Sequence, residues 1–139
     1  MSDKARLIEL LRKREVIRMR RIAADLGVTS AEHARIATMA DKLSTLIEEN
    51  RPREGEMSAP ALRARLGIGV KLEAQREISA NRAEFLRTEI DHSRKKLAQM
   101  KRRETLYGDR ASVERDAAEA AREAAAEQLL PPGRKGRKP

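Results

Sequence analysis

The sequence predicts an all-α fold: a long two-helix antiparallel coiled-coil hairpin followed by a disordered basic C-terminal tail. Three observations support this prediction. Apolar residues recur at alternating steps of three and four in two long segments, one proline-containing break separates these segments, and large core residues are scarce. The 139 residues include one Phe, one Tyr and no Trp, while 38% are charged. This composition suits solvated helices and lacks the side chains that fill a globular core.

The first helix is expected at about residues 3–50. Ser2 or Asp3 is placed to cap its start, and Pro52 ends it because the residue before a proline avoids the helical conformation. Its apolar stripe is narrow, as in a helix that pairs with one other helix. The stripe consists of Met19, Ile22, Leu26, Thr29, His33, Ile36, Ala40, Leu43 and Ile47.

The connection is expected at residues 51–59 and the second helix at about residues 60–130. Ser58 or Ala59 is placed to cap this helix, and Pro60 falls in its first turn, where a missing N–H group is harmless. Together, residues 1–130 form one predicted hairpin. The second stripe consists of Leu62, Gly69, Leu72, Ala83, Leu86, Ile90, Leu97, Met100, Tyr107, Ala111, Ala118, Ala121 and Ala125.

The two predicted helices differ in length. At about 1.5 Å per residue they extend roughly 70 Å and 105 Å, so about 20 residues of the second helix are expected to project beyond the first. We expect this overhang to begin near Gly108. From Ala111 onward it is rich in alanine and glutamate, and such a narrow helix is able to stand alone or to enter a narrow cavity.

Positive charge is concentrated at two places in a chain of net charge +9. Residues 1–21 contain eight cations against three anions, and the predicted tail, residues 131–139, contains four cations and no anion. An antiparallel hairpin brings these two ends to the same side. Contact with an acidic protein, a nucleic acid or an anionic membrane would explain this charge, and so would a solvated face that keeps the helices soluble.

A different interpretation centres on Gly27. Residues 22–32 resemble a helix-turn-helix of DNA-binding proteins, in which Gly27 makes the turn and Thr29 with Glu32 begins the second helix. His33 departs from that motif, because an aliphatic residue is usual at its position. A turn at Gly27 would also interrupt the stripe that continues from Met19 to Ile47. We therefore favour a continuous helix and keep nucleic-acid binding as the alternative.

Catalytic and metal-binding motifs are not found in the sequence. Its two histidines, His33 and His92, fall on different predicted helices, and the absence of cysteine excludes the usual zinc sites. Residues 67–69 (Gly-Ile-Gly) are too short for a phosphate-binding fingerprint, so we interpret them as a hinge or a closely packed point. No apolar run approaches the roughly 20 residues that span a membrane. We expect a cytoplasmic protein with no enzyme activity, no metal and no cofactor.

A family pattern is formed by residues 7–15 (LIELLRKRE), the proline-containing connection, and residues 95–104 (KKLAQMKRRE) leading into residues 119–123 (EAARE). Together these parts resemble the flagellar FliJ family and its type III secretion counterparts. The resemblance covers most of the chain. It implies an antiparallel coiled coil, similar to the central stalk of rotary ATP synthases, that enters the hexameric export ATPase, contacts the export gate in the membrane and assists export chaperones. The basic tail departs from the acidic ending usual in that family.

The resulting prediction is a non-enzymatic stalk or adaptor of a flagellar or type III protein export apparatus. Its location would be cytoplasmic or peripheral at the inner face of the cell membrane. The alternatives are a helix-turn-helix nucleic-acid-binding protein and a generic coiled-coil scaffold. The expected partner-binding residues are Leu7, Leu11, Arg14, Arg18, Lys101, Arg102 and Arg103.

Overall fold

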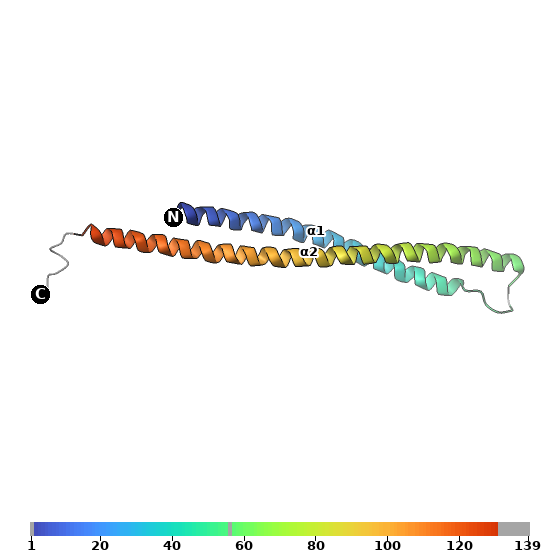
Figure 1. The fold of residues 1–139 in the computed structure, drawn as a ribbon. Coiled ribbons are helices and arrows are strands. Elements are labelled where there is room, and N and C mark those ends of the chain that lie inside the picture. Colours follow the sequence, from blue (N-terminus) through green and yellow to red (C-terminus); the bar gives the residue numbers. More distant parts are fainter. Residues whose placement is uncertain (1, 56, 131–139) are drawn as a thin grey trace. The chain divides into compact units, whose positions relative to one another are not determined.

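The structure, a computed structural model, describes residues 2–55 and 57–130. These residues form two helices, α1 (Asp3–Asn50) and α2 (Ala59–Gln128), and include no strand (Figure 1). The predicted all-α hairpin is therefore confirmed. The predicted basic tail, residues 131–139, lies outside the described residues.

The ends of α1 lie where the sequence places them. The Ser2 Oγ accepts a hydrogen bond from the Ala5 backbone N–H at 3.1 Å, so Ser2 is the N-cap. At the other end, the Arg51 N–H donates to the Glu48 carbonyl at 3.3 Å, which is the tighter spacing of a final turn. Pro52 follows at once, and the helix cannot continue through it.

Gly27 lies inside α1, which is helical on both sides of it. The Thr29 hydroxyl donates to the Asp25 carbonyl at 2.9 Å, four residues back, as side chains of helix-interior threonines do. Thr29 therefore does not cap a new helix. The predicted continuous helix is confirmed, and the turn that a helix-turn-helix requires at Gly27 is absent.

The connection between the helices contains Gly55, whose φ of 79° is in the left-handed region that glycine tolerates. The Ser58 Oγ then accepts a hydrogen bond from the Ala61 N–H at 3.3 Å and caps α2. At its far end, α2 stops at Gln128, slightly before the predicted residue 130. The N–H groups of Leu129 and Leu130 bond to carbonyls three residues back, which closes the helix.

The chain divides into two units, and both helices contribute to each. Unit 1 joins Met1–Arg21 with Leu97–Pro139, of which residues 2–21 and 97–130 are described. Its helices are antiparallel, because Lys4 pairs with Glu114 at 3.3 Å while Arg12, further along α1, pairs with Glu104 at 3.0 Å, earlier in α2.

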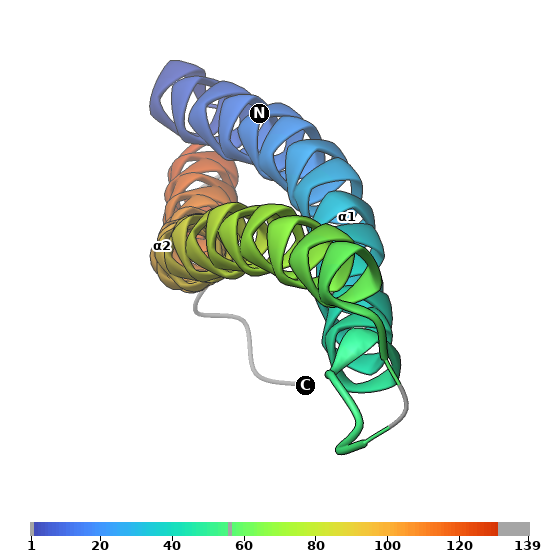
Figure 2. The ribbon, with the colours of Figure 1, turned by 90° about the vertical axis from the view of Figure 1, so that its right-hand side faces the viewer.

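Unit 2 is Ile22–Lys96 and contains the connection. Glu32 pairs with Arg82 at 3.1 Å, and the Asn50 Nδ2 donates to the Arg65 carbonyl at 2.8 Å, so these helices are antiparallel too. Figure 2 shows the end of α1 beside the start of α2, with the connection nearest the viewer. Gly69 lies in this region, where an added Cβ would be 3.5 Å from the Asn50 side chain. An added Cβ at Gly67 would meet nothing within 4 Å, so of residues 67–69 only Gly69 has a neighbour, and all three lie within α2.

The residues between the helices follow the predicted spacing of four and three. On α2 the less exposed positions repeat this spacing from Gly69 to Ala118, with Arg76 as an exposed interruption. On α1 the same spacing begins at Ala5, well before the predicted start at Met19. We call these facing positions the seam. Its most buried residues are Ala5, Glu15, Met100, Glu104 and Ala111 in unit 1, and Ile47, Ser79, Leu86 and Ile90 in unit 2.

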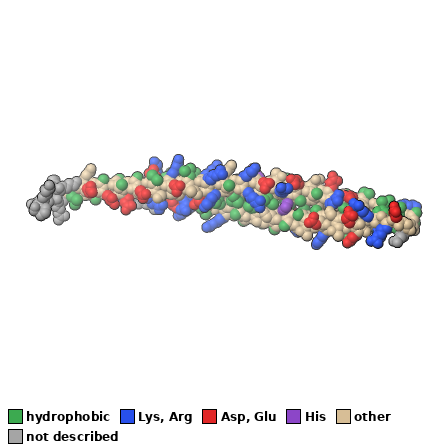
Figure 3. Space-filling model, turned by 90° about the horizontal axis from the view of Figure 1, so that it is seen from below, with side chains coloured by type: hydrophobic (Ala, Val, Ile, Leu, Met, Phe, Trp, Pro, Cys, Tyr) green, Lys and Arg blue, Asp and Glu red, His purple; other side chains and the backbone are tan. Residues whose placement is uncertain are grey.

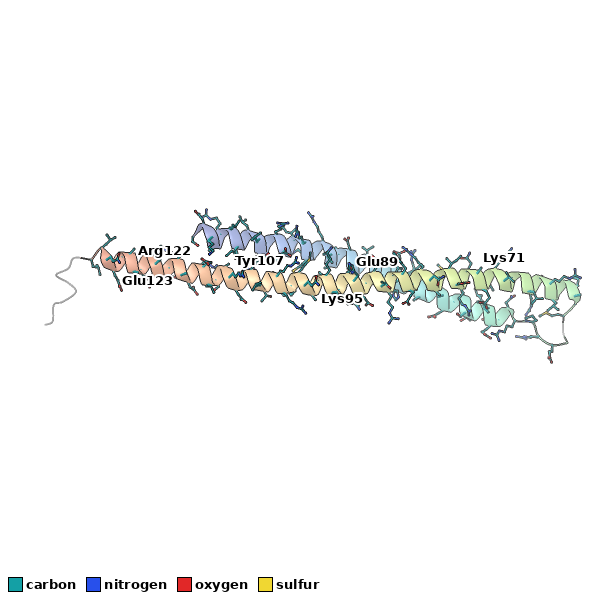
Figure 4. All side chains as sticks on the ribbon, in the orientation of Figure 1. Lys71, Glu89, Lys95, Tyr107, Arg122 and Glu123 are labelled. Carbon is teal, nitrogen blue, oxygen red and sulfur yellow. The ribbon has the colours of Figure 1, made fainter. Side chains whose placement is uncertain are left out.

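The predicted overhang is shorter than expected and begins later. Gly108 is beside the Arg12 side chain, and the ion pair between Lys4 and Glu114 places the start of α1 further along α2. The prediction was wrong because it assumed that pairing begins at the first residue of the second helix, whereas Asn50, the last residue of α1, contacts Arg65 and Gly69, several residues into α2. Residues 119–128 are all exposed, and α1 does not run beside Arg122 and Glu123 (Figure 4). We call residues 119–128 the α2 extension.

Candidate protein-binding surface

The predicted partner-binding residues all lie in unit 1. Leu7, Leu11, Arg14 and Arg18 are on α1, and Lys101, Arg102 and Arg103 are on α2. Leu11 and Arg18 are half-buried and the others are exposed. Whether they form one surface depends on which side of the seam each occupies.

For Leu11 and Arg103, the spacing of the seam residues shows that both lie on the same side of the seam. Each directly precedes a seam residue, Arg12 on α1 and Glu104 on α2. In an antiparallel coiled coil these preceding positions face each other along one flank. Unit 2 shows the rule directly, because Glu32 and Arg82 also precede seam residues and form an ion pair at 3.1 Å.

Further residues join this flank of unit 1 through their heptad spacing. On α1, Leu7 and Arg14 are four residues before Leu11 and Arg18, and on α2 the residues at the matching spacing are apolar or basic. We call the resulting surface the basic flank. It consists of Leu7, Leu11, Arg14, Arg18, Arg103, Leu106, Arg110 and Val113.

The basic flank combines apolar and cationic side chains. Leu7 is 59% exposed, Leu106 50% and Val113 64%, and arginines lie among them. Exposed apolar residues bordered by charge are typical of surfaces that bind other proteins. The flank is therefore suited to an amphipathic helix that carries negative charge.

Two predicted residues lie elsewhere. Lys101 follows the seam residue Met100 and so occupies the opposite flank, where its Nζ bonds to Glu104 at 3.1 Å. Arg102 is exposed and occupies the heptad position opposite the seam. The run of three basic residues at 101–103 is thus spread around the helix, and Arg103 alone belongs to the basic flank.

A layer of charged residues crosses the seam beneath this surface. The Arg12 Nε donates to the Glu104 Oε1 at 3.0 Å, and the Arg12 Nη1 donates to the Glu9 Oε1 at 2.9 Å. The Lys101 Nζ donates to the other Glu104 oxygen at 3.1 Å. Hydrogen bonds from Lys101 and Arg12 lower the pKa of Glu104, while those to Glu104 and Glu9 raise the pKa of Arg12.

Glu15 is a second carboxylate in the seam, with only 5% of its surface exposed. The Arg18 Nη1 approaches its Oε1 to 3.6 Å, while its Oε2 has no hydrogen-bond partner among the described residues. Arg12, Glu15 and Glu104 were not predicted as special residues. The available signal was their position, because steps of four and three continue from Met19 through Glu15 and Arg12 to Ala5.

An open groove lies in unit 2, where the end of α1 meets the start of α2. Ile47, Leu66 and Val70 supply apolar surface to it. Charged residues of both signs line it, so it does not select a ligand by charge. They are Asp41, Glu73, Glu77, Arg51, Arg65 and Arg76.

In residues 2–55 and 57–130, no cluster of three or more His, Asp or Glu side chains is arranged to hold a metal ion. Within the same part of the chain, neither helix is long and apolar enough to cross a membrane. No family model, curated protein or solved structure matches this chain.

Proposed function

We propose that this chain is a non-enzymatic stalk or adaptor of a flagellar or type III protein export apparatus. The observation that supports this proposal is the presence, in one unit, of the basic flank and the α2 extension. The basic flank supplies an apolar and cationic surface for an acidic partner, and the α2 extension supplies a narrow helix.

The basic flank is proposed to bind the hexameric export ATPase. Arg14 and Arg103 are exposed, and neither makes an ion pair among the described residues. They are therefore available to acidic side chains of a partner. Leu7 and Leu106 lie among these cations and would lose exposed apolar surface on binding.

The α2 extension is proposed to enter the central opening of that hexamer. Its residues 120, 121, 124, 125 and 126 are alanines, so the helix is thin and keeps a high helix propensity without a neighbour. Bulky side chains on a projecting helix would require a wider opening.

The export gate in the membrane and the export chaperones are the other proposed partners. A chain that meets all three would be cytoplasmic and, during export, peripheral at the inner face of the cell membrane. This assignment rests on the resemblance of residues 7–15 and 95–104 to the FliJ family. No cofactor is required by such a role.

Affinity purification from the host tests this proposal. The tagged chain is purified from nuclease-treated cytosol, and co-purifying proteins are identified by mass spectrometry. Recovery of an export ATPase, an export-gate component or an export chaperone would support the proposal. Recovery of none of them, with binding that appears only when nucleic acid is left intact, would favour a nucleic-acid-binding protein instead.

A further inference from the structure

A second heptad stripe runs along α2 on the same side as the basic flank and continues into the α2 extension. Its members are spaced by alternating steps of three and four, and every one is exposed. Such a stripe fits a second helix, just as the seam does. It consists of Arg103, Leu106, Arg110, Val113, Ala117, Ala120, Ala124 and Glu127.

The stripe has opposite charges at its two ends. Arg103 and Arg110 make its first half basic, whereas Glu127, with Glu123 at the adjoining heptad position, makes its second half acidic. In Figure 3, acidic side chains gather near the grey end of the molecule and basic side chains follow further along. A helix with this polarity is complementary to an antiparallel copy of itself.

We propose that two copies of this chain associate through this stripe, with their α2 helices antiparallel and the twofold axis between Val113 and Ala117. The spacing between stripe residues, alternately three and four, is the same in both directions from that axis. Arg103 then lies opposite Glu127 of the second copy, and Leu106 lies opposite its Ala124. Because the interface is twofold, each of these contacts is made twice.

The basic flank supplies the surface on which the α2 extension of the second copy would lie. In unit 1, the pairs Lys4 with Glu114 and Arg12 with Glu104 place Leu7 and Leu11 alongside residues 106–110 of α2. The extension would lie between these leucines and Leu106. Its alanines allow the close approach that larger residues would prevent, and they cover apolar side chains that are otherwise exposed.

A second copy of the chain suits this surface better than an unrelated helix, because the chain itself carries an exposed acidic helix next to the basic one. Residues 119–128 contain three glutamates and one arginine, and all ten are exposed. In the reversed direction Arg103 of the same unit lies opposite Glu127, and Arg110 lies opposite Ala120, about one helical turn from Glu123. Both halves of the interface are thus present in one chain, and the inference does not depend on the proposed role in export.

Sedimentation velocity of the full chain over a range of concentrations tests this inference. We expect a monomer–dimer equilibrium with a dissociation constant in the micromolar range, as for small interfaces, that weakens with added salt. Arg103→Glu and Glu127→Arg should each raise the dissociation constant about tenfold, because two like-charge contacts replace two attractive ones. The double variant should restore wild-type association.

Arg122→Glu is the matched control. Arg122 is an exposed cation of the α2 extension that lies on the other side of the helix from the stripe, so its reversal should leave association unchanged. Circular dichroism of each variant checks that the helices remain. A chain that is monomeric at every concentration would overturn the inference. The basic flank would then be a binding surface for an acidic helix of another protein. A dimer that is insensitive to both reversals would overturn it equally.

Discussion

Arg12 of α1 and Glu104 of α2 occupy facing positions of the seam and are joined at 3.0 Å. Glu9 and Lys101 complete the arrangement, so each charge of the central pair has a second partner of opposite sign. A polar layer within an apolar seam costs stability but favours one register over others. We interpret this layer as the element that fixes how the two helices of unit 1 align.

Replacing one member of this layer should destabilise the chain more than replacing both. Arg12→Leu leaves Glu104 without its cross-helix partner, and Glu104→Leu does the same to Arg12, so each should lower the melting temperature by a few degrees. The double variant should melt at or above the wild-type temperature, because its seam is apolar. Thermal unfolding followed by circular dichroism measures this, and strictly additive losses would contradict it.

The lowered pKa of Glu104 predicts an acid-dependent loss of stability. A carboxylate whose folded-state pKa lies below its ordinary value of 4.5 stabilises the folded state above that pH. This contribution is lost as the pH falls through the lowered pKa. The melting temperature of wild type should therefore exceed that of Glu104→Gln at neutral pH, and the difference should shrink below about pH 4.5. A difference that does not change with pH would contradict the assignment.

Replacing Glu15 with leucine should make the folded chain more stable. Its carboxylate is buried in the seam and one of its oxygens has no hydrogen-bond partner in the described part of the chain, whereas leucine at this position would continue the apolar stripe. Glu15→Leu should raise the free energy of unfolding by about 1 to 2 kcal/mol in urea titrations. Glu49→Leu, at an exposed position, provides the comparison and should have little effect. A loss of stability in Glu15→Leu would mean that the carboxylate has a stabilising partner.

Gly27→Ala should also stabilise the chain. Gly27 is helical, and an added Cβ would meet nothing within 4 Å. Alanine in an exposed helix interior is favoured over glycine by about 1 kcal/mol, so the free energy of unfolding should rise by about that amount. Helix content, measured by circular dichroism, should stay the same or increase. A decrease in helix content would indicate that the glycine makes a turn.

The fold was predictable because its signals are local and strong. Ser2 and Ser58 cap the helices, Pro52 ends the first, and the spacing from Met19 to Ile47 specifies a seam without knowledge of its partner. These features depend on residues a few positions apart. The boundaries of both helices followed from them to within a few residues.

The extent of pairing and the composition of the surface were less predictable. Arg12 and Glu15 look like surface residues in the sequence, since their burial depends on the opposite helix. The overhang was placed too early because the sequence does not reveal that Asn50 pairs several residues into α2, at Arg65. Lys101 and Arg103 are two residues apart in the sequence but occupy different flanks, which becomes evident only once Glu104 is recognised as a seam residue. Arg110 and Val113 were missed for the same reason.

Binding of the purified chain to the purified export ATPase of its host tests the proposed function most directly. We predict saturable binding that weakens with salt and is markedly reduced by Arg14→Glu with Arg18→Glu. The control is Lys13→Glu with Arg20→Glu, which changes the charge of α1 equally but away from the basic flank, and it should bind as wild type does. Absence of binding would contradict the proposed role, and equal loss in both double variants would contradict the assignment of the basic flank.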